Sequence, residues 1–173
     1  MLKAFSLNRV LPLIVMLVAA ASAKAQRAVP DAYASTVKVS YVRNWEASKP
    51  TTDPASITTA SPVQDFKMTT QYLDGLGRPL QAVNKGGSLN TVTNTSGDLV
   101  SAVEYDAFGR VQFQYLPFAA NTTGGNSSVN DGMFKLNPFH QQASFYNSAS
   151  TSSPITGQGE TWLYSQTQFQ ASP

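Results

Sequence analysis

Two copies of one turn motif constrain the fold of this chain more than any other feature of its sequence. Residues 73–78 (LDGLGR) and 105–110 (YDAFGR) both read (Leu/Tyr)-Asp-x-x-Gly-Arg and lie 32 residues apart. Aspartate is favoured at the first position of a type I turn because its carboxylate accepts backbone N–H groups within the turn. Glycine is favoured at the fourth position because it adopts a left-handed conformation without a Cβ clash. The motif therefore predicts two β-hairpins with four-residue turns.

The residues that flank both turns alternate with a period of two, as expected for strands with one buried face. Pro79 predicts a strand start or an edge position, because proline cannot donate to a β-ladder. Both hairpins need partners, since isolated hairpins are only marginally stable in water. The residues predicted to share a face are Phe66, Met68, Thr70 and Tyr72 before the first turn, Leu99, Ser101, Val103 and Tyr105 before the second, and Val111, Phe113 and Tyr115 after it.

The rest of the sequence predicts a mainly β fold of antiparallel hairpins with long flexible loops and one short helix. We expect one β-rich domain at residues 26–173, preceded by a signal peptide at residues 1–25. Its parts are a first strand within 33–48 that alternates over 36–43, a Pro/Thr/Ser-rich linker at 49–62, the two hairpins within 63–118, and a short helix with a final strand within 133–173. The helix is predicted at 137–146, with Asn137 as its cap and Pro138 in its first turn. The final strand is predicted at 160–169.

Three further segments are predicted to be loops. Residues 85–97 are expected to link the two hairpins, because the Gly86-Gly87 and Ser96-Gly97 pairs are typical of turns. Residues 119–132 and 148–159 are rich in Asn, Ser, Gly and Thr and are expected to be flexible. Gly132 is therefore expected to tolerate substitution, whereas Gly109 is expected to be required by its turn.

The first 25 residues have the three parts of a secretory signal peptide. Lys3 and Arg9 form a positive region, residues 10–21 are apolar, and residues 23–25 (AKA) form a small-x-small cleavage site. The apolar run is short for a membrane span, which needs about 20 residues. No cysteine is present, which excludes a lipoprotein anchor, disulfides and thiolate metal sites. We therefore expect an exported protein without a membrane span once the leader is removed, and the alternative is a leader that stays uncleaved as an N-terminal anchor.

Loss of the leader changes the charge. The full chain has 12 basic and 10 acidic residues, and removal of three basic residues with the leader leaves a net charge of −1. A nearly neutral surface without a Lys/Arg cluster argues against nucleic acid as a partner, because phosphate neutralisation dominates such binding.

Few residues suggest chemistry. His140, the single histidine, could act as a general base or a metal ligand, or face solvent on the helix, which we favour because no second His or Cys exists. Glu104 and Asp106 could form a carboxylate pair, but Asp106 is needed by its turn. Arg78 and Arg110 could bind an anionic ligand, or bond the turn and pair with Asp74 and Asp106, which we favour. We predict no catalytic, cofactor-binding or metal-binding residues and no cofactor.

The aromatic residues allow two interpretations. The rings could form a platform that stacks sugars, or they could fill the core, which we favour because a small β domain without cysteine needs its large rings inside. The rings concerned are Trp45, Trp162, Tyr72, Tyr105, Tyr115, Tyr146 and Tyr164.

The tandem hairpin motif resembles the YD repeat of the Rhs proteins, which are large secreted or surface-displayed chains that include bacterial polymorphic toxins. A longer ordered set of segments, from about Val37 to Pro173, looks like the uncharacterised domain that begins many Rhs-type proteins of Gram-negative bacteria. The first copy departs from the repeat, because Leu73 stands where tyrosine is preferred. The segments are 70–81 (TQYLDGLGRPLQ), 105–110, 115–118 (YLPF), 131–139 (DGMFKLNPF), 164–167 (YSQT) and 169–173 (FQASP).

The resemblance implies a structural role. In the family, YD repeats that build a β-rich shell follow this domain, so we expect either a truncated product or a free-standing copy. We expect a non-enzymatic N-terminal segment that caps or plugs the repeat shell, whose open end exposes unpaired strand edges. Its partner would be the downstream shell, in the same chain or in another. The alternative is a surface adhesin or glycan-binding module, with a cell-surface glycan as its partner.

The leader generates the first testable prediction. The mature protein should begin at Gln26 and be recovered outside the cytoplasm, because cleavage should follow Ala25. N-terminal sequencing of protein from the periplasm or medium measures this directly. A cytoplasmic species that retains Met1 would contradict export.

Overall fold

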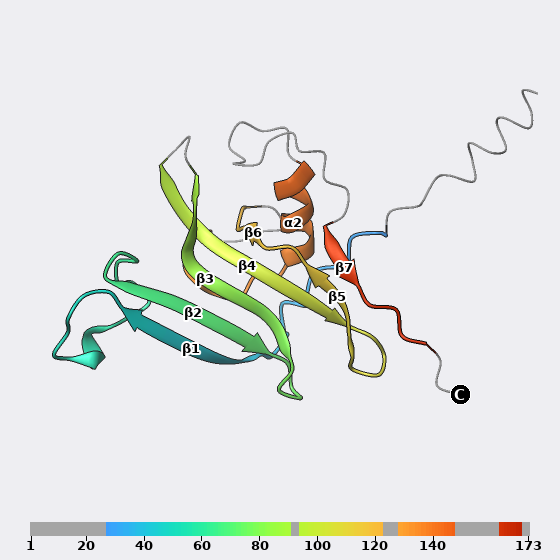
Figure 1. Cartoon of the computed structure of the whole chain (residues 1–173), viewed down its shortest axis with the longest axis horizontal. Helices are drawn as coiled ribbons and strands as arrows, with labels where there is room; N and C mark the ends of the chain where they lie inside the picture. The colour runs from blue at the N-terminus through green and yellow to red at the C-terminus, as the bar shows by residue number, and fades with distance from the viewer. Residues whose placement is uncertain (1–26, 91–93, 123–127, 148–162, 171–173) are drawn as a thin grey trace, which may run out of the picture.

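The computed structural model describes residues 27–90, 94–122, 128–147 and 163–170, and it confirms the mainly β class. Within these residues, seven strands form one antiparallel sheet, and one α-helix packs against it (Figure 1). The elements are β1 (Ser40–Ala47), the 3₁₀ turn η1 (Pro54–Ser56), β2 (Phe66–Leu73), β3 (Pro79–Asn90), β4 (Thr95–Tyr105), β5 (Val111–Tyr115), β6 (Phe118–Ala119), α2 (Pro138–Asn147) and β7 (Tyr164–Gln166).

The strands follow the order β1-β2-β3-β4-β5-β7, and β6 pairs with β4 beside β5. The two predicted hairpins are β2–β3 and β4–β5, and they have the same register. Tyr72 pairs with Gln81 in the first and Glu104 with Phe113 in the second, 32 residues further on, and each register then shifts by one residue next to the turn. Both turns lie at the same end of the sheet (Figure 1). The sheet is therefore built from two copies of one unit.

One face of the sheet is covered, and the opposite face is open to solvent. Directly paired residues of antiparallel strands point to the same face, so the register assigns each side chain. The covered face carries buried residues from five strands: Met68, Thr70, Tyr72, Gln81, Val83, Asp98, Val100, Ala102, Phe113, Tyr115 and Phe118. The open face carries exposed polar residues, among them Thr69 and Asn84, whose side chains are hydrogen-bonded across the strands. The predicted alternation of Met68, Thr70 and Tyr72 is confirmed.

The predicted burial of β4 is wrong. Leu99, Ser101 and Val103 do share a face, but that face is the open one, where all three are half-buried. The covered face of β4 instead carries Val100 and Ala102. The sequence misleads because both faces of β4 hold aliphatic residues, so alternation alone does not select the side on which other segments pack.

Helix α2 closes the core over the covered face. Phe145 joins a cluster with Val83, Val100 and Phe118, and Phe139 joins a second cluster with Phe113 and Tyr115 among its members. Pro138 begins the helix as predicted. Asn137 stands at the cap position, but its carbonyl accepts the hydrogen bond from the N–H of Gln141, while its side-chain oxygen is buried and accepts none from the described residues.

Two predicted boundaries are wrong. The first strand begins at Ser40 rather than 36, because residues 34–37 form a turn and the N–H of Tyr33 bonds the carbonyl of Leu136 instead of the sheet. Residues 85–97 are not a loop, because β3 and β4 continue through most of them with an irregular register between Asn84 and Ser88. Gly86 has a φ of +62° at that irregularity, where its N–H bonds Asp98.

Some expectations fall on residues that the structure does not describe. Residues 148–159, the start of the final strand at 160–162, Trp162 and the signal peptide at 1–25 lie outside the described residues. Across the described segments, no helix is long and apolar enough to cross a membrane.

The expected tolerance of Gly132 is also wrong, which yields a second prediction. Gly132 is buried with a φ of +67°, and an added Cβ would lie 1.9 Å from the methyl of Met68 and 3.2 Å from the Cβ of Lys85. Gly132→Ala should therefore lower the free energy of unfolding by about 2 kcal/mol or more, through backbone strain and displacement of Met68.

Gly75→Ala is the matched control, because an added Cβ there meets nothing within 4 Å. It should change stability by less than about 0.5 kcal/mol. Urea unfolding of both variants provides the comparison, and equal midpoints would contradict the constraint at Gly132.

Candidate functional site

The two turns have the same hydrogen bonds. In the first, the N–H of Asp74 bonds the carbonyl of Arg78 at 2.9 Å, and Asp74 Oδ1 accepts the N–H groups of Leu76 and Arg78 at 2.9 Å each. The second turn repeats these contacts from Asp106 at the same three distances. Gly77 and Gly109 both have a φ of +78°. The prediction that aspartate and glycine close each turn is confirmed.

Each turn arginine pairs with the aspartate of its own turn, as predicted. Arg78 Nη2 lies 2.6 Å from Asp74 Oδ2, and Arg110 Nη2 lies 2.7 Å from Asp106 Oδ2. The backbone N–H of Arg78, followed by its side chain, holds the pKa of Asp74 below its usual value. These arginines are therefore occupied within the fold.

Each arginine also stacks on an aromatic ring: Tyr105 at the end of β4 for Arg78, and Phe169, three residues beyond the end of β7, for Arg110. The guanidinium of Arg78 lies 4.5 Å from the ring centre of Tyr105, and that of Arg110 lies 3.8 Å from the ring centre of Phe169. The two contacts occupy equivalent places. Gln81 pairs with Ala102 three residues before Tyr105, and Phe113 pairs with Gln166 three residues before Phe169. We call each such contact an arginine–aromatic rung.

The first strand explains the departure at Leu73. Leu73 stands where the second turn has Tyr105, and the register places Ser40 opposite it. Ser40 occupies the place that an arginine holds in the other two rungs, so no guanidinium is available there for an aromatic ring to stack on. The arginine and the aromatic residue are absent together, although the first turn itself has the standard hydrogen bonds.

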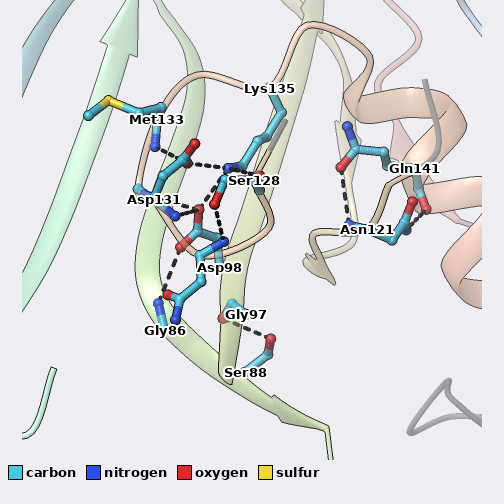
Figure 2. Close-up of polar contacts among 12 residues, drawn as sticks. Gly86, Ser88, Gly97, Asp98, Asn121, Ser128, Asp131, Met133, Lys135 and Gln141 are labelled. Carbon is cyan, nitrogen blue, oxygen red and sulfur yellow. Dashed lines mark hydrogen bonds and ion pairs between the residues drawn. The ribbon is translucent and has the colours of Figure 1, made fainter. Parts of the chain in front are cut away.

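A buried ion-pair cluster fastens residues 128–136 to the sheet (Figure 2). Lys135 Nζ lies 2.7 Å from Asp98 Oδ2 and 2.7 Å from Asp131 Oδ1, and the side chains of Lys135 and Asp98 are 2% and 0% exposed. Asp98 also accepts the backbone N–H groups of Gly86, Asp131 and Gly132. The Asp98 carboxylate therefore connects β4 to residues 131 and 132, so the prediction that 119–132 is flexible is wrong for this part of the segment.

A second contact fixes the same segment to β3. Gln81 Nε2 donates to the carbonyl of Lys135 at 3.2 Å, and Gln81 Oε1 accepts the N–H of Lys135 at 2.8 Å. The side-chain amide thus satisfies both backbone groups of one residue, as a neighbouring strand would.

The carboxyl group of Asp131 is affected by the same cluster. Burial would raise the pKa of Asp131, but hydrogen bonds from Lys135 and the N–H of Met133 outweigh this effect and lower the pKa.

The start of the described chain is fixed by a third cluster. Arg27 Nη2 lies 2.5 Å from Glu104 Oε1, Arg27 Nη1 donates to the hydroxyl of Tyr115 at 2.9 Å, and the guanidinium stacks 3.9 Å from the ring centre of Phe113. Burial, followed by the nearby Glu104 charge, raises the pKa of Tyr115. A pocket beside this cluster, also lined by Phe139 and Leu163, has about 30 Å³ of space, room for about two water molecules.

The residues considered for chemistry do not come together. His140 is exposed on α2, as predicted. Glu104 bonds Arg27 and Tyr115, whereas Asp106 bonds its own turn, so the two carboxylates serve different structures. Among the described residues, no group of three His, Cys, Asp or Glu side chains could hold a metal ion.

Most of the described aromatic residues are buried or half-buried, whereas Tyr41, Phe108 and Phe169 are exposed. Tyr72 and Tyr115 are buried, and Trp45, Tyr105, Tyr146 and Tyr164 are half-buried. Tyr146 donates to the carbonyl of Pro117, and Tyr105 donates to that of Pro79. The rings of Phe113, Tyr115, Phe139 and Tyr164 contact one another in the core.

The sequence reading missed Asp98 and Lys135. One signal was present, because Asp98 alternates with Val100 and Ala102 and so lies on a strand face that is otherwise apolar. Lys135 lies between Phe134 and Leu136, which also suggests an unusual environment. A buried charged side chain requires a partner of opposite charge, but the sequence does not show that Lys135 is the partner of Asp98.

The chain matches the family described as a domain of unknown function, DUF6443, over residues 43–173. This match covers most of the chain, which therefore belongs to that family. No curated protein and no solved structure matches the chain.

The ion-pair cluster generates a third prediction. Lys135→Met should lower the free energy of unfolding by about 3 kcal/mol or more, because it leaves Asp98 as a buried charge without its cation. Lys67→Met is the matched control, since its ion pair with Glu46 is exposed and spans 3.8 Å. That control should change stability by less than about 0.5 kcal/mol. Similar urea midpoints for the two variants would contradict a dominant role for the cluster.

Proposed function

We propose that this chain is the N-terminal structural segment of a secreted or surface Rhs/YD-repeat protein, and that it caps or plugs the repeat shell. The observation that carries the proposal is the series of arginine–aromatic rungs. The series begins after Ser40 and Leu73, where both partners are absent, and continues through Tyr105 to Phe169. A repeat array needs such a beginning, because its terminal unit differs from the units that follow.

The two edges of the sheet also support an array that begins at β1 and continues beyond β7. The outer strand β1 carries Arg43 and Glu46, and charges on an edge strand discourage further pairing. Residues 164–170 (YSQTQFQ) on the other side contain neither a charge nor a proline. One side of the sheet therefore resembles an end, and the other resembles a point of continuation.

The contacts of Arg27 also support export. Arg27 would be the second residue of the mature protein if cleavage follows Ala25, and it binds Glu104 and Tyr115 on the sheet. The residues directly after the expected cleavage site thus contribute to the fold rather than serving only as a leader. Without cysteine, the stability of an exported chain depends on such burial and pairing.

A non-enzymatic role is supported by the use of the polar side chains. The charged groups of the three clusters, centred on Asp98, Arg27 and the turns, are bound to one another or to backbone groups. The inward packing of Tyr72 and Tyr115 supports the cap over the glycan-binding alternative, which needs a row of rings that face solvent.

The proposal yields a fourth prediction. A YD-repeat shell from the same organism, expressed without its N-terminal domain, should bind the chain spanning 26–173 and co-elute with it on size exclusion. The melting temperature of the chain should rise by about 5 °C at saturating shell, because a partner that binds only the folded form stabilises it. An unrelated exported β domain, melted with the same shell, is the control.

The contrary result is equally specific. A clean monomer that melts cooperatively at high temperature, independently of its concentration, and neither binds nor is stabilised by the shell would contradict the capping role. Binding to cell-surface glycans in the same preparation would then favour the adhesin alternative.

A further inference from the structure

The last described strand stands in the place of the first strand of a third hairpin. Phe169 contacts Arg110 three residues beyond the pair Phe113–Gln166, just as Tyr105 contacts Arg78 three residues beyond the pair Gln81–Ala102. In both complete units, the strand that ends at this position has a returning strand on its outer side, β3 beside β2 and β5 beside β4. β7 pairs with β5, and no described strand lies on its other side (Figure 1).

The hydrogen bonds of β7 identify which backbone groups face outward. The carbonyl of Leu163 accepts from the N–H of Leu116, and the N–H of Thr167 donates to the carbonyl of Gln112, each at 2.9 Å. Residues 163, 165 and 167 therefore direct their backbone groups towards β5. Because these directions alternate along an antiparallel strand, the N–H and C=O groups of Tyr164 and Gln166 point away from β5, to the outer edge.

Among the described residues, the outer edge of β7 lacks the features with which natural proteins block strand pairing. Edge strands are usually protected by charges, proline, bulges or a covering segment. Residues 164–170 have no charge and no proline, whereas β1 at the opposite side of the sheet has Arg43 and Glu46. The same chain thus protects one edge and leaves the other able to pair.

We propose that the outer edge of β7 binds an antiparallel β-strand of the YD-repeat partner, in the place that β5 and then β6 occupy along β4. The incoming strand would donate to and accept from the backbone groups of Tyr164 and Gln166. Its apolar residues would alternate as Phe113 and Tyr115 do in β5, so that they continue the covered face. This inference rests on the proposed function for the identity of the partner, and it is carried by continuity of the register from β4 to β7.

Two probes test the inference. The first is the YD-repeat shell lacking its N-terminal domain, and the second is an acetylated and amidated peptide, RVQFQYL, that copies residues 110–116. Binding of each to the chain spanning 26–173 is measured by calorimetry, and amide hydrogen exchange reports protection at Tyr164 and Gln166. Both probes should bind and should slow exchange at these two amides.

Gln166→Pro is the informative variant, because it removes an outward N–H and leaves the bonds of residues 163, 165 and 167 to β5 in place. It should weaken binding of both probes by about tenfold or more. Gln166→Ala keeps the amide and is the matched control, which should bind as the unaltered chain does. An unchanged exchange rate at Thr167 in both variants shows that β7 remains paired with β5.

The outcomes separate this inference from the proposed function. Shell binding that Gln166→Pro does not weaken would overturn the β7 site and leave the capping role intact. Failure of the shell to bind, with the peptide still bound at β7, would overturn the partner and the capping role while showing that the edge accepts a strand. Self-association of the chain that Gln166→Pro abolishes would identify a second copy as the occupant and overturn the proposed partner.

Discussion

The ion pair between Lys135 and Asp98 is the contact on which the covered face of the sheet depends. The sheet is a single layer, and residues 128–147, with Tyr33 and Val39, pack on one side of it to form the core. Asp98 reaches three backbone N–H groups as well as the ammonium group, so one carboxylate joins β3, β4 and the segment that leads into α2. Removing charges from water is costly, and this cost is offset only where hydrogen bonds and partners are complete.

The contacts around the ion pair meet that condition. Gln81 satisfies both backbone groups of Lys135, and Tyr72 donates its hydroxyl to the carbonyl of Gly132. Gly132 allows this close approach because it has no Cβ. The segment therefore lies on the sheet through polar contacts of defined geometry, and Phe139 and Phe145 then add the apolar part of the core.

Local features of the fold could be predicted from the sequence, and features that depend on distant segments could not. The turns at Asp74 and Asp106 follow from residues within six positions of each other, and Pro138 marks the start of α2 in the same local way. The buried side of β4 depends on what packs against it, and Leu99 and Val100 are both apolar, so the sequence gives no preference. Asp98 and Lys135 are 37 residues apart, and the pairing becomes visible only when the fold brings them together.

The arginine–aromatic rungs link the architecture to the proposed role. The residues Ser40 and Leu73 show that loss of the arginine coincides with loss of the ring, so the rung is a paired feature of two adjacent units. Phe169 contacts Arg110 although Gln170 stands where the two turns have aspartate. The rung therefore marks β7 as part of the array, and it does so independently of the turn motif.

An experimental structure of the chain bound to a YD-repeat shell would show which edge of the sheet the shell contacts. We predict an antiparallel strand of the shell hydrogen-bonded to the outward backbone groups of Tyr164 and Gln166, with β1 remaining the outer edge of the joined sheet. A complex in which the shell contacts only β1 or the open face of the sheet, with the outer edge of β7 left in solvent, would contradict it.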